Sequence, residues 1–103
     1  MLNIFKNLFG PGTDFKTLQQ QGAVIIDVRT AGEFSGGHIK GAINIPVDSI
    51  RSKISDIKKK GKPVITCCAS GMRSGSATSI LKQAGVEAYN GGSWMSLQNK
   101  MAS

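Results

Sequence analysis

A cysteine followed by a short loop and an arginine is the part of this sequence best suited to chemistry. Cys68 ends an apolar run that begins at Pro63, four small or flexible residues separate it from Arg73, and a Ser- and Ala-rich stretch of helical character follows. We interpret this order as strand, tight loop and helix. Inward-facing loop N–H groups and the positive end of a helix both stabilise an anion, and both favour thiolate over thiol. The pattern therefore predicts an active-site loop with Cys68 as nucleophile.

The loop itself would supply the activation of this thiol. The residues expected to contact a bound anion are Ala69, Ser70, Gly71, Met72 and Arg73. Gly71 lets the backbone curve without a Cβ clash, and the planar guanidinium of Arg73 suits an oxyanion. His38, the single histidine, lies thirty residues upstream, so no Cys–His pair is expected. Backbone amides, the helix terminus and Arg73 would then make Cys68 largely thiolate at neutral pH.

The neighbouring cysteine, Cys67, is expected to be buried. Adjacent residues on a strand point to opposite faces, so the sequence predicts one exposed thiol, Cys68, and one buried thiol. A disulfide between neighbours would be strained, which favours a reducing compartment and a cytoplasmic location. Two adjacent cysteines and a distant histidine do not form a tetrahedral zinc site, and Cys-x-x-Cys is absent. No metal and no cofactor is predicted.

Charge and hydropathy limit the possible partners. Thirteen Lys and Arg against six acids give a net charge of +7, with a cluster at Lys58-Lys59-Lys60 and Lys62. Such a surface suits nucleic acid, an anionic membrane or small anions, but no aromatic residue interleaves with the lysines, which disfavours nucleic acid. The simplest reading is a solvated helix end whose cations complement the helix dipole.

The first nine residues are apolar but short. No apolar run approaches the ~18 residues of a transmembrane segment, and the start lacks the basic region of a signal peptide. Ile4, Phe5, Leu8 and Phe9 recur at helical spacing. Residues 1–12 are therefore expected to form an extension, with a short amphipathic helix as one reading, that either packs on the domain or makes weak membrane or partner contacts. Residues 13–103 would form the domain.

Strands and helices alternate along this domain. Helices are expected from Thr13 or Asp14 to Gln20, after the capping box Thr30–Glu33 through about Ser35, along the apolar stripe Val47, Ile50, Ile54 and Ile57, along Ala77, Ile80, Leu81 and Ala84, and after Ser93. Strands are expected over 23–28, 42–45, 63–68 and 86–89, with 90–92 as a turn. The alternation predicts an α/β domain with a mostly parallel sheet between two layers of helices.

Three motifs in this order resemble a single-domain rhodanese-like sulfurtransferase, over roughly residues 14–97. The first is Asp27-Val28-Arg29 followed by Glu33-Phe34 and by residues 37–46, GHIKGAINIP. The second is the loop CASGMRS from Cys68 to Ser74, and the third is Gly91-Gly92 with Trp94. The resemblance implies the three-layer α/β/α rhodanese domain.

The resemblance also implies a reaction. Cys68 would take the outer sulfur of a donor such as thiosulfate and pass it, as a persulfide, to cyanide or a thiol. The amides of Ala69 through Arg73 would hold the persulfide and the anionic donor. Arg29 would add a second cation near the entrance, Asp27 and Ser74 would support the site, and the basic surface would steer donors towards it. The implied partners are a small anionic donor and a thiol or cyanide acceptor, with a protein acceptor as a further alternative and no nucleic acid.

Three alternatives stay open. A cysteine phosphatase or arsenate reductase would use five residues between cysteine and arginine, whereas four lie between Cys68 and Arg73, and the smaller ring suits a sulfane sulfur better than a phosphate. A non-catalytic binding module is disfavoured by the presence of Cys68. A sulfur carrier that delivers to a protein partner is the third alternative.

Overall fold

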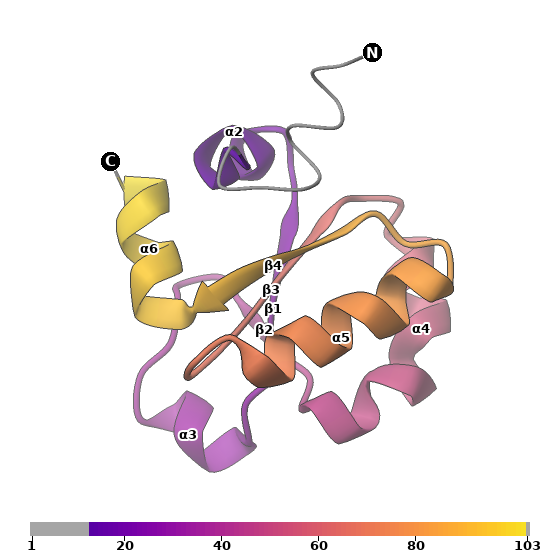
Figure 1. The fold of residues 1–103 in the computed structure, drawn as a ribbon, viewed down its shortest axis with the longest axis horizontal. Helices are drawn as coiled ribbons and strands as arrows, with labels where there is room; N and C mark the ends of the chain where they lie inside the picture. The colour runs from indigo at the N-terminus through magenta and orange to yellow at the C-terminus, as the bar shows by residue number, and fades with distance from the viewer. Residues whose placement is uncertain (1–12, 103) are drawn as a thin grey trace.

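The computed structural model describes residues 13–102 of the 103 (Figure 1). In chain order the elements are α2 (Phe15–Gln20), β1 (Val24–Asp27), α3 (Ala31–Ser35), β2 (Ile43–Asn44), the 3-10 turn η1 (Val47–Ser49), α4 (Ile50–Lys59), β3 (Val64–Cys68), α5 (Met72–Gln83), β4 (Ala88–Ser93) and α6 (Trp94–Ala102). The strands form one sheet in the order β2-β1-β3-β4, and every neighbouring pair is parallel. The predicted α/β class is confirmed.

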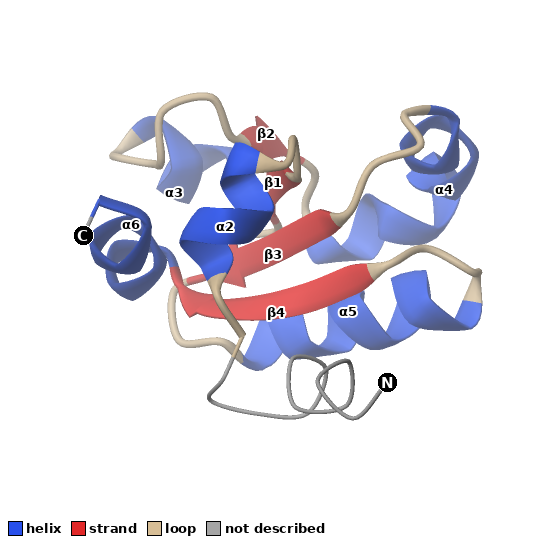
Figure 2. Cartoon of the chain, turned by 90° about the horizontal axis from the view of Figure 1, so that it is seen from above, coloured by secondary structure: helices blue, strands red, loops and turns tan. Residues whose placement is uncertain are grey.

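Helices cover both faces of this sheet (Figure 2). On one face, α4 and α5 pack on Ile26, Val64 and Cys68. On the other face, α2 and α6 pack on Ile25, Ile65 and Cys67. Alternate residues of β1 and β3 thus enter two separate apolar clusters, because side chains alternate across a strand. The nearly continuous apolar run of each strand follows from this two-sided burial.

Local hydrogen bonds fix the two short helices near the start of the domain. The Asp14 side chain accepts from the N–H of Thr17 at 3.1 Å and caps α2. The Thr30 hydroxyl accepts from the Glu33 N–H at 3.2 Å, and the Glu33 carboxylate accepts from the Thr30 N–H at 3.0 Å. This is the predicted capping box of α3. The capping box places Glu33 in the first turn of α3, the helix that follows the carboxyl end of β1.

The last strand corrects the prediction for residues 86–92. The sequence suggested a strand over 86–89 and a turn at Asn90-Gly91-Gly92, but β4 begins only at Ala88 and continues through the expected turn to Ser93. Thr66 pairs with Asn90 and Cys68 pairs with Ser93, so β4 carries one extra residue opposite β3, as in a β-bulge. A Cβ on Gly91 would lie 2.8 Å from both Leu97 Cδ2 and the carbonyl oxygen of Thr66. The absence of a side chain at Gly91 therefore allows Leu97 and the Thr66 backbone to pack closely against β4.

Two further expectations need comment. Val47 lies in η1, ahead of α4, although the sequence placed it on the helical stripe. The N-terminal extension, residues 1–12, lies outside the described residues. Among residues 13–102, no helix is both long and apolar enough to cross a membrane.

Candidate active site

The sulfur of Cys68 lies where the first N–H groups of α5 point. The Gly71 N–H donates to Cys68 Sγ at 2.9 Å, and the Ser74 N–H lies 3.4 Å from the same atom. Gly71 itself precedes α5 with a φ of 100° and provides no side-chain cap. The first N–H groups of a helix need acceptors from outside the helix. Cys68 Sγ thus serves as the N-terminal cap of α5, and the loop curves around it.

These donors lower the pKa of Cys68. Burial by itself raises the pKa of this thiol, but the Ser74 hydroxyl and the N–H groups of Ser74, Gly71 and Ser70 together outweigh burial. Hydrogen bonds to a charged form stabilise that form. The net direction agrees with a thiolate nucleophile.

The exposure predicted for Cys68 is wrong. Its side chain is 0% exposed, as is that of Cys67, because helices cover both faces of the sheet at β3. Both cysteines are free thiols. Ala69 and Ser70 in the loop are exposed.

Cys67 has a different environment. It packs with Ile25, Ile65 and Leu97 on the α2–α6 side of the sheet. Burial, and to a smaller extent the carboxylate of Asp27, raises the pKa of Cys67 to about 12. At neutral pH this thiol stays protonated, and the two neighbours differ in reactivity because they face opposite layers.

Asn90 is a site residue that the sequence reasoning missed. Its Nδ2 donates to the Gly71 carbonyl at 3.1 Å, and its Oδ1 accepts from the Ser74 hydroxyl at 2.7 Å and from the Gly92 N–H at 2.9 Å. It thus ties the loop and α5 to β4. The residue was assigned to a turn, and a polar residue before two glycines gives no sign that it faces a neighbouring loop.

Ser74 links Asn90 to the sulfur. Its Oγ lies 3.4 Å from Cys68 Sγ and 2.7 Å from Asn90 Oδ1, and a hydroxyl has one proton to donate. With a Cys68 thiol, Ser74 donates to Asn90 and accepts from the thiol. When Cys68 is a thiolate, the Ser74 hydroxyl can rotate and donate its hydrogen bond to the sulfur instead. The predicted supporting position of Ser74 is therefore next to the sulfur itself.

Arg73 is held by a carboxylate. Its Nη1 and Nη2 atoms lie 2.7 and 3.0 Å from the two carboxylate oxygens of Glu33, and both side chains are more than a third exposed. The hydrogen bond from Arg73 lowers the pKa of Glu33 to about 2. Arg73 thus joins the loop to α3, and its charge is largely balanced by this partner. Met72, between Gly71 and Arg73, is 81% exposed.

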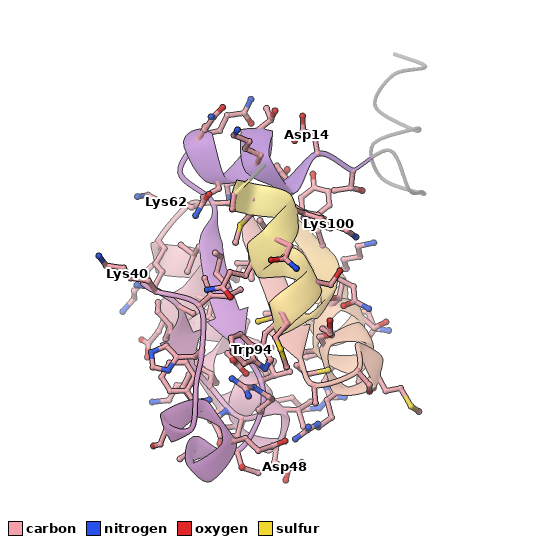
Figure 3. The ribbon with its side chains drawn as sticks, turned by 90° about the vertical axis from the view of Figure 1, so that its left-hand side faces the viewer. Asp14, Lys40, Asp48, Lys62, Trp94 and Lys100 are labelled. Atoms are coloured by element: carbon pink, nitrogen blue, oxygen red, sulfur yellow. The ribbon has the colours of Figure 1, made fainter. Side chains whose placement is uncertain are left out.

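Arg29 and Asp27 form a buried ion pair at the carboxyl end of β1. Arg29 is 5% exposed, and its Nη2 donates to Asp27 Oδ2 and to the Gly37 carbonyl, each at 2.7 Å. Its guanidinium carbon lies 4.9 Å from the centre of the Trp94 ring, which Figure 3 labels at the start of α6. These contacts join β1 to the end of α3 and to α6. They give Arg29 structural partners on several elements, and its expected role as a second cation for the donor stays a prediction.

The comparisons with known proteins agree with this geometry. Residues 12–98 match the family model of the rhodanese-like domain. The Bacillus subtilis protein YqhL, whose name describes it as uncharacterized, is 44% identical over 69 residues, which are 66% of this chain and 54% of YqhL. A tRNA sulfurtransferase of Thermoplasma acidophilum is 34% identical over 68 residues, 65% of this chain and 13% of that protein. The chain thus spans about half, or much less, of the length of these relatives.

Solved structures show the same fold over nearly their own full length. A structure described as rhodanese with anions from E. coli has 31% sequence identity and a TM-score of 0.67, over 73% of this chain and 91% of that one. The human single-domain sulfurtransferase TSTD1 has 26% identity and a TM-score of 0.63, over 82% and 89% of the two chains. Sulfurtransferases are therefore among the proteins that share both this fold and a recognisable sequence.

Proposed function

Because this chain belongs to the rhodanese-like domain family, we propose that it is a sulfurtransferase that carries a sulfane sulfur on Cys68. The donor would be an anionic sulfane such as thiosulfate, and the acceptor cyanide or a thiol. The observation that supports this most is the set of donors aimed at Cys68 Sγ, with the Gly71 N–H at 2.9 Å. A thiolate held by backbone amides needs no histidine base.

In the first step the Cys68 thiolate attacks the outer sulfur of thiosulfate. A bond forms between Sγ and that sulfur, the sulfur–sulfur bond of thiosulfate breaks, and sulfite leaves with the bonding electron pair. The enzyme is left with a persulfide anion, and no proton has to move. Amides of Ala69 through Arg73 would hold the negative charge of donor and persulfide, as an oxyanion hole does.

In the second step the acceptor attacks the outer sulfur of the persulfide. Cyanide forms thiocyanate, or a thiolate forms a new persulfide, and the Cys68 thiolate leaves with the electron pair of the broken bond. The same donors that lower the pKa of Cys68 make it a better leaving group. One arrangement therefore assists both half-reactions, as ping-pong covalent catalysis requires.

Each supporting residue has a proposed task. Arg73, held by Glu33, would keep the loop curved, and Ser74 would donate to the thiolate. Asp27 and Arg29 would support the carboxyl end of β1. The four residues between Cys68 and Arg73 make a smaller ring than a phosphate-binding loop, which supports sulfur transfer over phosphate hydrolysis.

A protein thiol is the second candidate for the acceptor. Among the described residues, the large apolar side chains that are strongly exposed are Met72 and Met95. Met72 opens α5 and Met95 lies in the first turn of α6, and these helices follow the neighbouring strands β3 and β4. Flexible methionines suit a protein contact beside the loop.

Intact mass spectrometry after incubation with thiosulfate tests the proposal. The wild-type chain is expected to gain the mass of one sulfur atom, and cyanide should remove it as thiocyanate. Cys68→Ser should gain nothing, whereas the matched variant Cys67→Ser should still gain one sulfur. Absence of any adduct, together with hydrolysis of a phosphate ester, would overturn the proposal in favour of a phosphatase.

A further inference from the structure

The side chain of Asn90 contacts two of the groups that donate to Cys68 Sγ. Its Oδ1 accepts from the Ser74 hydroxyl at 2.7 Å, and its Nδ2 donates to the Gly71 carbonyl at 3.1 Å. The Gly71 N–H and the Ser74 hydroxyl lie 2.9 and 3.4 Å from Cys68 Sγ. Asn90, on β4, can therefore influence the reacting sulfur through both of these neighbours.

The amide of Asn90 has one favourable orientation. The Gly71 carbonyl can only accept a hydrogen bond, and the Gly92 N–H, 2.9 Å from Oδ1, can only donate one. These two backbone groups fix which end of the amide is the oxygen. A Cβ on Gly75 would lie 3.3 Å from Asn90 Nδ2, so this glycine leaves room for the amide beside α5. The Ser74 hydroxyl therefore has a fixed acceptor in Asn90 Oδ1.

Ser74 is held so that rotation of its hydroxyl is its main remaining freedom. The residue is 0% exposed, and its carbonyl accepts from the hydroxyls of Thr66 and Thr78 at 3.0 and 2.8 Å. Its O–H carries one proton, which can point to Asn90 Oδ1 or to Cys68 Sγ. The stronger of these two acceptors therefore determines the direction of the hydroxyl.

In the proposed reaction, the charge on Cys68 Sγ differs between two states of the domain. In the unloaded state Sγ is a thiolate, and a charged acceptor forms the stronger hydrogen bond. In the loaded state Sγ is bonded to the transferred sulfur, and the negative charge lies on that outer sulfur. A divalent sulfur is a weak acceptor, so Asn90 Oδ1 becomes the better partner for the Ser74 hydroxyl.

We propose, on the basis of the sulfur transfer proposed above, that Asn90 is a positioning residue that stabilises the loaded domain by accepting the Ser74 hydroxyl hydrogen bond. During discharge the acceptor bonds to the outer sulfur, the bond from that sulfur to Sγ breaks, and its electron pair stays on Sγ. The Ser74 hydroxyl turns from Asn90 to Sγ, while its proton stays on Ser74 Oγ. An interaction that strengthens towards the transition state speeds a step. Ser74 therefore assists discharge, whereas Asn90 favours loading.

Single-turnover measurements of the two half-reactions test this division. Loading by thiosulfate and discharge by cyanide are each followed by intact mass, at a pH above the Cys68 pKa of every variant. Ser74→Ala should slow discharge about tenfold, because a hydrogen bond to the developing charge is lost, and should leave loading unchanged or faster. Asn90→Leu keeps the approximate size of the side chain but removes the acceptor, so it should speed discharge and slow loading. Ser76→Ala, on the exposed side of α5, should change neither.

The double variant Ser74→Ala/Asn90→Leu separates the direction of the hydroxyl from a general loosening of the loop. Without the hydroxyl, Asn90→Leu should no longer speed discharge. Asn90→Asp is a second test, because it keeps the acceptor and strengthens it, and should slow discharge. Thermal unfolding checks that each variant is folded. Equal slowing of both half-reactions by Ser74→Ala and Asn90→Leu would overturn the proposal, as would an effect of Asn90→Leu that is the same without the Ser74 hydroxyl.

Alkylation of Cys68 by iodoacetamide provides a readout that does not depend on sulfur transfer. The pKa of Cys68 should rise in Ser74→Ala and fall in Asn90→Leu, where the hydroxyl has no competing acceptor. Arg73, a cation that interacts with Cys68, keeps its Glu33 partner in these variants. An unchanged or raised pKa in Asn90→Leu would show that Asn90 does not compete with the sulfur. A wild-type chain that never gains sulfur would overturn the proposed function, whereas normal loading and discharge in both variants would overturn the role of Asn90 alone.

Discussion

Arg73 in the active-site loop and Glu33 in α3 form a two-pronged ion pair across 40 positions of the chain, at 2.7 and 3.0 Å. Glu33 also closes the capping box of α3 through its contact with Thr30. One carboxylate therefore orders the helix after β1 and holds the loop after β3. Because these strands are neighbours in the sheet, the pair joins two crossover connections at their carboxyl ends.

Glu33→Gln separates the two tasks of this carboxylate. A glutamine can keep the capping box but loses the charge that Arg73 pairs with. We expect a modest fall in the thermal unfolding midpoint at pH 7, since the pair is more than a third exposed. Asp56→Asn, on α4, should have little effect.

The loss should depend on pH. The pKa of Glu33 is lowered from 4.5 to about 2 in the fold, so its stabilisation is present above about 4.5 and disappears as the pH falls to about 2. The difference in unfolding midpoint between wild type and Glu33→Gln should shrink across this range. A difference that stays constant down to pH 2 would contradict the ion pair as its cause.

Ser74→Ala removes one of the donors around Cys68. The Ser74 N–H remains, but the hydroxyl that can stabilise the thiolate is lost, so the pKa of Cys68 should rise. Iodoacetamide alkylation of Cys68, followed by mass spectrometry over a pH series, measures this pKa. Ser76→Ala on the exposed side of α5 is the matched control. Identical pH profiles in both variants would show that the amides alone set the pKa.

Asn90→Asp tests the residue that ties the loop to β4. The new carboxylate can still accept from the Ser74 hydroxyl and the Gly92 N–H, but it loses the donor to the Gly71 carbonyl and adds a negative charge one hydroxyl away from the sulfur. A nearby like charge disfavours the thiolate, so the pKa of Cys68 should rise. Alkylation at neutral pH should slow, and Asn99→Asp in α6 should leave it unchanged. Faster alkylation of Asn90→Asp would contradict this account.

Gly91→Ala tests the close approach inside β4. The added Cβ would meet Leu97 Cδ2 and the Thr66 carbonyl at 2.8 Å, and such overpacking costs roughly 1–3 kcal/mol. Urea unfolding should show this loss of stability. The control Gly32→Ala, in α3, meets nothing within 4 Å and should be neutral or slightly stabilising, because alanine is the better helix former. Equal stability of the two variants would mean that the sheet adjusts around Gly91.

Much of this fold could be predicted because its signals are local. The capping box at Thr30 and Glu33 and the apolar runs of β1 and β3 each depend on residues a few positions apart. The bulge in β4 could not be predicted from local sequence. A glycine is needed at position 91 because Leu97 and the Thr66 backbone approach it closely, and not because the chain turns there. A glycine pair looks the same in either setting.

The candidate site likewise has one part that local sequence predicts and another that depends on contacts between distant residues. The strand–loop–helix order around Cys68 indicates thiolate stabilisation, which agrees with the lowered pKa. The sequence did not reveal that the Glu33 carboxylate pairs with Arg73, or that Asn90 reaches the loop. These partners come together at one edge of a parallel sheet from distant positions, so their pairing depends on strand order. The burial of Cys68 likewise follows from α4 and α5, which the strand pattern alone does not place.

The opposite orientation of Cys67 and Cys68 has a consequence for the lifetime of a bound sulfur. A persulfide with a second thiol in reach collapses to a disulfide and loses its outer sulfur as hydrosulfide. Cys67 is next in sequence, yet it belongs to the α2–α6 cluster while Cys68 belongs to the α4–α5 cluster. The backbone of β3 separates the two sulfurs, so the proposed persulfide on Cys68 would keep its outer sulfur until a nucleophile arrives from solution. β3 would thereby protect a sulfur bound to Cys68 from attack by the neighbouring thiol of Cys67.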